Sequence, residues 1–525
     1  MKLVPTFLIL SSLFSGADAV ASSVDPASAT ATLDLKKIDQ IVTSAMAEFQ
    51  VPGLAIAVVS QDKVLLAKGY GVRDIGNNQP VTAQTLFGIA SNTKAFTAAA
   101  LAMLVDQGKL SWDDKVIQHL PEFQLFDAYV SREMTIRDLL SHRSGLGLGA
   151  GDLLIWPDTN KSTADIIKAL RFIKPASSFR SEYAYNNLMF VVAGEVVARV
   201  SGQSWQQFVE QQLFSPLGMT TTAAGFSRIA ADNQNRAVGH IPLDNKLQRY
   251  PLDYLEDFRG AGAIASNVSE MSLWLRTQLA NGVMPDGKRL FSAAQQQQMW
   301  QLHINAPVSQ NSFDSTRQQF AGYGLGWSID DYFGYKRLSH GGGILGMVSQ
   351  VTLVPEQKLG IVILTNQQAF PAITVISREV LEQALALPDK DWLQELSGKY
   401  HSGREKLYKN SGPLQLTEVQ PALTNQHYSA NFASDWYGHV SIKQIDGKLR
   451  IKFSHTPKLQ GWLVHHSGNR FVVQWDDRLM EADAYIDFEF GAKNQLQGAK
   501  MQLVNPDITD FSFDFHDLVL SVTKP

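Results

Sequence analysis

The chain has 525 residues, of which 45% are hydrophobic and 18% are charged. It can therefore bury a large core, and it exceeds the usual size of one domain. A formal net charge of -4 provides no basic field that would gather nucleic acid or anionic lipid, so neither is an expected partner. Because the chain has no cysteine, disulfides, thiolate metal sites and a cysteine nucleophile are excluded together. Any covalent catalysis must use an oxygen or nitrogen nucleophile.

The N-terminus has the order of a secretory signal. Lys2 precedes an apolar run over 3–14, and an A-x-A pattern follows at 17–19. We expect 1–19 to be a cleaved signal peptide and 20–33, rich in Ala, Ser and Thr, to be a flexible leader. The mature protein is then periplasmic or secreted. No later segment approaches the roughly 20 apolar residues of a membrane helix, so no stable membrane insertion is expected.

Helix and strand signals alternate along residues 34–387, where we expect the first globular domain. Apolar residues at helical spacing predict a helix up to about Phe49, and two apolar runs, over 54–60 and 64–70, predict a hairpin. The pattern between 112 and 290 is mainly helical. Strands distant in sequence around a helical middle predict an α+β fold, in which an antiparallel sheet is flanked by helices and carries an inserted helical lobe, with a cleft between sheet and lobe. Later strands are expected at 323–329, 347–354 and 360–364, and a last helix at 373–385.

The tail, residues 388–525, has a different pattern, and we place a domain boundary near Pro388. Helical periods are expected to end there, and alternating apolar runs separated by Gly-containing turns follow. These runs predict a small all-β antiparallel barrel or sandwich. The expected hairpins pair 440–444 with 448–453, 462–466 with 471–475, and 485–490 with 499–504.

Ser91 and Lys94 stand one helical turn apart at the start of an apolar helix expected over 91–106, so their side chains share a face. Serine is a weak nucleophile unless a neighbouring base takes its proton, and a lysine desolvated in an apolar helix can lose its charge near neutral pH. Lys94 is the only charged residue between Asp74 and Asp106, which argues against a solvated surface position. The pattern thus indicates a nucleophile and its base, whereas the alternative is an ordinary helix cap beside a solvated lysine.

A second polar group, Tyr185 and Asn187, lies just before an apolar helix that begins at Leu188. A phenol near Lys94 can pass a proton to a leaving group, and an amide can hydrogen-bond both the lysine and a substrate carbonyl. Tyr185 is therefore a candidate catalytic residue and Asn187 a candidate substrate-binding residue. A buried tyrosine followed by a helix-capping asparagine is the structural alternative.

A third group begins at His340, which is followed by three glycines and then by a predicted strand pair. Glycines allow a substrate backbone to approach closely, and the N–H of Gly343 can join that of Ser91 in an oxyanion hole. We assign His340 and Gly342 to substrate binding, with His340 either orienting Tyr185 or meeting a substrate carboxylate as a cation. A glycine turn with an incidental histidine is the alternative.

These three groups resemble, in order and spacing, the S-x-x-K, Y-x-N and H-x-G motifs of serine beta-lactamase and penicillin-binding-protein-like hydrolases. Residues 135–146 and 323–327 are also similar to that family, and the resemblance covers 34–387. It implies a class C-like beta-lactamase/transpeptidase fold and a covalent acyl-enzyme on Ser91. The tail is similar to the lipocalin-like β-barrel appended to many members. No metal and no cofactor are expected, because the histidines lack metal-ligand spacing such as H-E-x-x-H.

Within the family, beta-lactamases and transpeptidases usually carry lysine where His340 stands, whereas D-amino-acid aminopeptidases and related peptidases often carry histidine. The resemblance therefore implies an exported serine hydrolase of the D-aminopeptidase/esterase branch that cleaves amide or peptide bonds, including D-amino-acid-containing peptides or peptidoglycan fragments. A carboxylesterase and a weak beta-lactamase are alternatives within the family. A non-catalytic receptor for penicillin or peptidoglycan is an alternative of another class. Whether Lys94 or Tyr185 is the acylation base, and whether the protein is a homo-oligomer, stay open.

Overall fold

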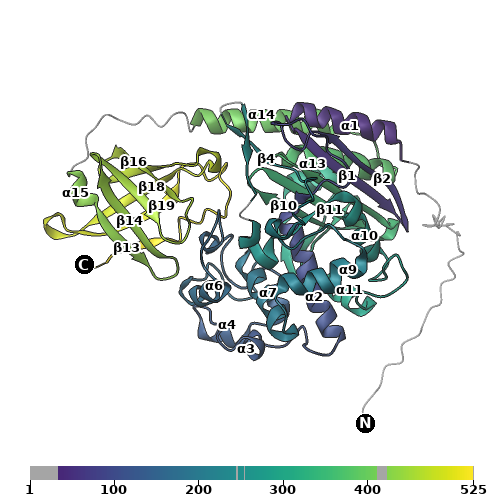
Figure 1. The fold of residues 1–525 in the computed structure, drawn as a ribbon, viewed down its shortest axis with the longest axis horizontal. Coiled ribbons are helices and arrows are strands. Elements are labelled where there is room, and N and C mark those ends of the chain that lie inside the picture. Colours follow the sequence, from purple (N-terminus) through teal and green to yellow (C-terminus); the bar gives the residue numbers. More distant parts are fainter. Residues whose placement is uncertain (1–32, 244–245, 253–254, 411–422, 524–525) are drawn as a thin grey trace, which may run out of the picture.

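The computed structural model describes residues 33–243, 246–252, 255–410 and 423–523. The expected signal peptide and all but the end of the expected leader lie outside the described residues. Figure 1 shows a larger part built from helices and a sheet, with a β-barrel in green to yellow beside it. Among the helices in the described ranges, none has the length and apolarity needed to cross a membrane.

Within the described residues, the larger part is centred on an eight-stranded sheet in the order β2-β1-β12-β11-β10-β9-β8-β7. Its strand β1 (Gly53–Ser60) pairs with β12 (Leu359–Thr365), which comes from the opposite end of this part, and every pairing in the sheet is antiparallel. The prediction of one sheet made from sequence-distant strands is thus confirmed. The other strands are β2 (Lys63–Gly71), β7 (Ile304–Ala306), β8 (Ala321–Tyr323), β9 (Ser328–Tyr332), β10 (Tyr335–Ile344) and β11 (Met347–Val354); the short pairs are β3 (Phe87–Gly88) with β6 (Ala265–Ser266), and β4 (Gly239–Leu243) with β5 (Lys246–Tyr250).

Helices cover both faces of the sheet, which explains why every residue of β1 is buried. Successive side chains of a strand point to opposite faces. Ile56 and Val58 pack in one cluster with α1 (Leu35–Glu48) and α13 (Phe370–Ala384), whereas Ala57 joins the cluster of the helical lobe on the other face. β1 therefore lies within a three-layer core.

The helical lobe packs around α2, which is buried on nearly every side. Its apolar sequence accounts for this position, since a helix that is hydrophobic all round needs cover on all faces. The helices of this region are α2 (Thr93–Asp106), α3 (Val116–His119), α4 (Ala128–Glu133), α5 (Ile136–Leu139), α6 (Thr163–Ala169), α7 (Leu188–Ser201), α8 (Trp205–Phe208), a π-helix (Val209–Phe214), α9 (Ser215–Leu217), α10 (Val268–Leu279), α11 (Ala293–Met299) and α12 (Gln310–Thr316).

Two local predictions are corrected, and one alternative is excluded. Ser91 lies in a 3-10 turn, Ala90–Asn92, that precedes α2 rather than in the α-helix itself. The single strand expected over 323–329 is the end of β8, a turn and the start of β9. The glycines after His340 belong to strand β10, not to a turn, because β10 pairs with β11 through Ile344.

The tail contains a closed barrel of strands β13 to β20, which confirms the predicted all-β barrel and its three hairpins. The expectation that helical structure ends at Pro388 is wrong. A further helix, α14 (Trp392–Asn410), packs on α13 before the barrel begins (Figure 1). The remaining elements are α15 (Asn425–Tyr428), β13 (Ala430–Ser434), β14 (Gly438–Ile445), β15 (Lys448–Phe453), β16 (Gln460–Ser467), β17 (Arg470–Trp475), β18 (Ala484–Phe490), β19 (Leu496–Leu503) and β20 (Val519–Val522).

Candidate active site

Hydrogen bonds on either side of Ser91 hold its turn against the sheet. Its Ala90 has a positive φ of 48°, a conformation that costs free energy for a residue with a Cβ and needs support from its surroundings. The Ser349 hydroxyl on β11 provides that support, because it donates to Ile89 O at 2.7 Å and accepts from Asn92 Nδ2 at 2.8 Å. Ser91 is thereby held at the junction of sheet and helical lobe.

Gly342 makes room for this turn. A Cβ at position 342 would lie 2.4 Å from Ile89 O and 2.4 Å from Ser349 Oγ, closer than real Cβ atoms come. The residues that line the pocket include Gly341 and Gly343 but not Gly342. The structure therefore places Gly342 beneath the nucleophile turn, where it packs, rather than against a substrate as the sequence suggested.

Lys94 is completely buried, and three acceptors surround its Nζ. Nζ lies 3.0 Å from Ser91 Oγ, 2.7 Å from Asn187 Oδ1 and 2.8 Å from the carbonyl oxygen of Ala261. Burial lowers the pKa of Lys94 to about 7, and the Asp152 carboxylate opposes that shift. A neutral amine keeps two hydrogens for Asn187 and Ala261, so its lone pair faces Ser91. The geometry is that of a general base beside its nucleophile.

Tyr185 completes this group. Its hydroxyl is close enough to Ser91 for the serine to influence its pKa, and Lys94 Nζ lies 4.8 Å from the centre of its ring. Burial raises the pKa of Tyr185 well above its usual value of 10, and the interaction with Ser91 only partly offsets this effect. The phenol is therefore protonated at neutral pH and can donate a hydrogen bond or a proton.

The loop that presents Tyr185 is fixed by His142. The N–H of Asn186 donates to His142 Nδ1 at 3.1 Å, and the N–H of Ala184 donates to the His142 carbonyl at 3.0 Å. The imidazole lies against the Tyr185 ring with 4.2 Å between the ring centres. Burial, followed by the charge on Lys94, lowers the pKa of His142 well below its usual value, so the ring is neutral. Sequence reasoning included His142 only within a family-like stretch and gave it no role.

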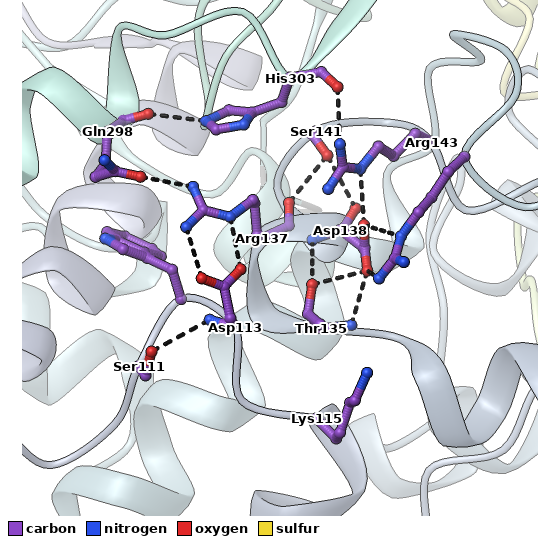
Figure 2. A network of polar contacts seen from close by, with 12 residues as sticks. Ser111, Asp113, Lys115, Thr135, Arg137, Asp138, Ser141, Arg143, Gln298 and His303 are labelled. Carbon is purple, nitrogen blue, oxygen red and sulfur yellow. Dashed lines mark hydrogen bonds and ion pairs between the residues drawn. The ribbon is translucent and has the colours of Figure 1, made fainter.

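A network of ion pairs and hydrogen bonds surrounds Asp138 and Arg143, the residue that follows His142 in the chain (Figure 2). The Asp138 carboxylate is fully buried; it accepts from Arg143 Nε at 2.7 Å, from Arg180 Nη2 at 2.6 Å and from Thr135 Oγ1 at 2.7 Å. Burial by itself would raise the pKa of Asp138. The hydrogen bonds from Arg180, which are the largest of the opposing effects, help to lower it below its usual value. Because Arg143 follows His142 directly, the network fixes the segment beneath Tyr185.

His340 is paired with Tyr323 rather than with Tyr185. Its Nδ1 lies 2.6 Å from the Gly341 carbonyl, which can only accept, so Nδ1 carries the proton and Nε2 accepts from the Tyr323 hydroxyl at 2.7 Å. Burial, followed by the charge on Lys94, lowers the pKa of His340 to about 3. A neutral imidazole cannot serve as the cationic carboxylate ligand that the sequence left open.

Ser91 and Gly343 both line one pocket of about 480 Å³. β10 pairs with β9 only up to Ser339, so its edge beyond that residue is not covered by β9. The pocket is thus lined by both residues of the expected oxyanion hole, and one of them, Ser91, is also the nucleophile. Its lining residues are Ala90, Ser91, Leu148, Trp156, Tyr185, Asn187, Phe258, Ala261, Gly262, Ser328, His340, Gly341, Gly343, Ile344, Phe370, Thr509, Asp510, Phe511 and Ser512.

The barrel supplies part of this wall. Residues 509–512, which lie between β19 and β20, line the pocket, and the Phe511 ring lies edge-on to Tyr185 with 6.0 Å between the ring centres. Asp510 is the one acidic residue among the described residues that line the pocket. Sequence reasoning missed this segment. No motif or spacing marked it, because its place in the site depends on how the barrel packs on the helical lobe.

Taken together, the fold and this geometry define a serine hydrolase with a beta-lactamase/transpeptidase-like catalytic part. The family model described as Beta-lactamase matches residues 38–385, more than half of the chain. The chain therefore belongs to the beta-lactamase family, which confirms the resemblance of its motifs. A second model, described as a domain of unknown function, DUF3471, matches residues 417–521.

Several known proteins are similar to this chain. Unguisins hydrolase ungD of Aspergillus violaceofuscus is 26% identical over 464 residues, which cover 82% of this chain and 81% of the fungal protein. Penicillin-binding protein 4 of Amycolatopsis lactamdurans is 31% identical over 329 residues, which cover 61% of this chain and 82% of that protein.

Two solved structures share the fold. The octameric penicillin-binding protein homologue from Pyrococcus abyssi has a TM-score of 0.59 at 21% identity and covers 93% of this chain and 100% of its own. A class C beta lactamase from Rhodobacter sphaeroides has a TM-score of 0.51 at 19% identity over 66% of this chain and 98% of its own. At these identities the likeness concerns the fold alone.

Proposed function

We propose that this protein hydrolyses amide bonds in small peptides that carry a free amino group near the scissile bond, including peptides with D-amino acids, through an acyl-enzyme on Ser91. The observation that carries the substrate class is the charge of the pocket. Asp510 provides an anion, whereas Lys94 beside the nucleophile and His340 in the pocket lining are held neutral or near neutrality by burial.

In the proposed reaction Lys94 acts as the general base and Tyr185 as the general acid. Lys94 accepts the Ser91 proton as Oγ attacks the carbonyl carbon, because its pKa of about 7 leaves much of the amine free at neutral pH. The N–H groups of Ser91 and Gly343 stabilise the oxyanion. The phenol of Tyr185 passes a proton to the leaving amine and regains one from the Lys94 ammonium, so both groups return to their starting forms. In the second half of the reaction Lys94 takes a proton from the attacking water and returns it to Ser91 Oγ as the acyl group leaves. Tyr185 does not act as a tyrosinate, since its pKa lies well above 10.

Asp510 supports recognition of an ammonium group. Burial in the cleft raises the pKa of Asp510, so a cationic partner stabilises its charged form. Burial is the main cause of the raised pKa of Tyr185, and the Asp510 carboxylate raises it further. The charge of Asp510 therefore acts close to the reacting groups. A substrate carboxylate, such as that of a penicillin, meets an anion here instead of a cation. This charge pattern disfavours antibiotic hydrolysis.

The names of two relatives agree with an acyl-transfer enzyme on peptide-like substrates. One relative is named as a hydrolase of unguisins and another as a penicillin-binding protein. Neither name identifies the substrate of this chain, which the pocket must determine.

The test combines active-site labelling with a matched pair of substrates. Wild type and Ser91→Ala are incubated with a fluorophosphonate and, separately, with a penicillin, and adducts are located by intact mass and peptide mapping. D-alanine p-nitroanilide is then compared with its N-acetyl derivative in wild type and in Asp510→Asn. We expect a Ser91 adduct and a preference for the free amine that falls about tenfold in Asp510→Asn, as the loss of one charge-assisted hydrogen bond would give.

Each outcome decides one part of the proposal. Full turnover by Ser91→Ala would contradict the acyl-enzyme. If no reagent modifies wild type while a related hydrolase reacts, the non-catalytic receptor becomes the better account. Equal rates with both anilides, unchanged in Asp510→Asn, would remove the amine from the proposal and leave the esterase as the alternative. Rapid penicillin turnover would instead favour a weak beta-lactamase.

We also propose that the protein is exported and that it forms a homo-oligomer. The charged, apolar and small-residue order of residues 1–19 supports export to the periplasm or medium. The octameric state named for the Pyrococcus abyssi homologue is the reason to test assembly. Cell fractionation with N-terminal sequencing tests the first, and light scattering of the purified protein tests the second.

A further inference from the structure

Asp152 is a buried carboxylate one contact away from the catalytic lysine, and no motif pointed to it. It begins the 3-10 turn Asp152–Leu154 and is completely buried. Its Oδ2 accepts from Asn187 Nδ2 at 2.7 Å and from the hydroxyl of Ser512 at 2.9 Å. Ser512 belongs to the barrel, so one carboxylate oxygen joins the catalytic part to the tail.

The contact decides which way the Asn187 amide points. An asparagine side chain has one acceptor end and one donor end, and Lys94 needs the acceptor, Oδ1, at 2.7 Å. Asp152 accepts from the donor end. If the amide turned over, its NH2 group would face Lys94, one of the two fixed acceptors of the amine would be lost, and the lone pair would no longer be directed at Ser91.

The loop that holds Asp152 depends on the barrel for its shape. The Gly151 N–H donates to the buried carboxylate of Asp514 at 2.6 Å. Gly149 has a φ of +66°, and a Cβ there would lie 2.9 Å from the Phe511 carbonyl oxygen. The barrel segment, residues 510–514, therefore packs directly on the loop of residues 149–152.

We propose that Asp152, held by Ser512 of the barrel segment, is a positioning residue that sets the Asn187 amide so that Lys94 can accept the Ser91 proton. The catalytic group is thus complete only when the barrel is docked on the helical lobe. This inference depends on the proposed role of Lys94 as base but not on the proposed substrate.

The test measures how fast Ser91 reacts with a fluorophosphonate as a function of pH, using the full-length chain. The variants are Asp152→Asn, which keeps the shape of the side chain, and Ser512→Ala. The matched control is Thr456→Val, because the Thr456 hydroxyl also joins the barrel to this turn, donating to Leu153 O at 3.3 Å, without touching Asp152. Circular dichroism and thermal unfolding verify that each variant is folded.

We expect Asp152→Asn and Ser512→Ala to react at least tenfold more slowly at neutral pH, and Thr456→Val to stay within twofold of wild type. In Asp152→Asn the apparent pKa of the profile should move to lower pH, since the carboxylate that stabilises the Lys94 ammonium is gone. A merely structural role would not move the profile.

Three results would overturn the inference or its basis, and they are distinguishable. If wild type reacts at Ser91 and both variants keep its rate and profile, Asp152 has no positioning role while the proposed function stands. Asp152 also loses that role if Thr456→Val slows the reaction as much as Ser512→Ala, because docking in general would then explain the loss. If wild type does not react at all, the proposed function itself fails.

Discussion

Replacing Gly342 with alanine tests whether the turn that carries Ser91 can keep its position only when residue 342 has no side chain. The added Cβ would lie 2.4 Å from Ile89 O and from Ser349 Oγ, about 1 Å short of the 3.4 Å at which ordinary contact begins. Since Ser349 Oγ also bonds Ile89 and Asn92, it cannot turn aside without breaking both contacts. Either β10 or the turn must shift by about 1 Å.

Such overpacking typically costs about 1–3 kcal/mol of unfolding free energy. A displacement of about 1 Å at a catalytic group costs on the order of 100-fold in rate. We therefore expect Gly342→Ala to unfold at lower denaturant concentration and to react about 100-fold more slowly with a fluorophosphonate.

Gly341→Ala is the matched control, because the nearest heavy atom to its added Cβ is Phe370 Cε1 at 3.8 Å, an ordinary contact. Denaturation curves and the rate of Ser91 labelling are compared for wild type and both variants. If Gly342→Ala matches wild type in both measurements, or if the two variants lose stability equally, the steric reasoning is refuted.

Three further outcomes follow from the same structure. The pKa of Lys94, lowered to about 7, predicts that kcat/KM rises about tenfold per pH unit below pH 7 and levels off above it as the amine loses its proton; a profile flat from pH 5 to 8 would contradict Lys94 as base. Asp138→Ala leaves Arg143 without its buried partner and should lower the unfolding free energy by about 3–5 kcal/mol at pH 7. Because the pKa of Asp138 is lowered in the fold, its stabilisation is present above pH ~4 and is lost as pH falls below that value, so mutant and wild-type denaturation midpoints should converge in acid. Tyr323→Phe leaves Nε2 of His340 without its donor and should cost about 1–3 kcal/mol in the same assay, whereas unchanged midpoints would show that this hydrogen bond contributes nothing.

The sequence by itself determined the elements whose signal is local. A one-turn spacing places Ser91 and Lys94 side by side in any helix-like turn, and an almost uncharged helix predicts a desolvated lysine. Apolar runs likewise predicted β1, β11 and β12 and the barrel hairpins. A strand buried on one face alternates apolar and polar residues, and a strand buried on both faces is apolar throughout, so its burial can be recognised from its own residues.

The helix α14 was missed for the opposite reason. It is polar over most of its length, so its few apolar residues gave only a weak helical signal. Its first residue, Trp392, is fully buried in the cluster formed with α13, and that packing stabilises the helix. Tertiary contact, not local preference, decided this element.

The tertiary structure alone decided how the site is completed. Ser512 lies 360 residues beyond Asp152 in the chain, yet the two side chains share a hydrogen bond, and the partner of His340 proved to be Tyr323 instead of Tyr185. Polar side chains in loops carry no periodicity, so only the docking of the barrel on the helical lobe reveals which of them meet. For the same reason, the charges of Lys94 and His340 follow from burial, a property of the folded chain that neither residue type specifies.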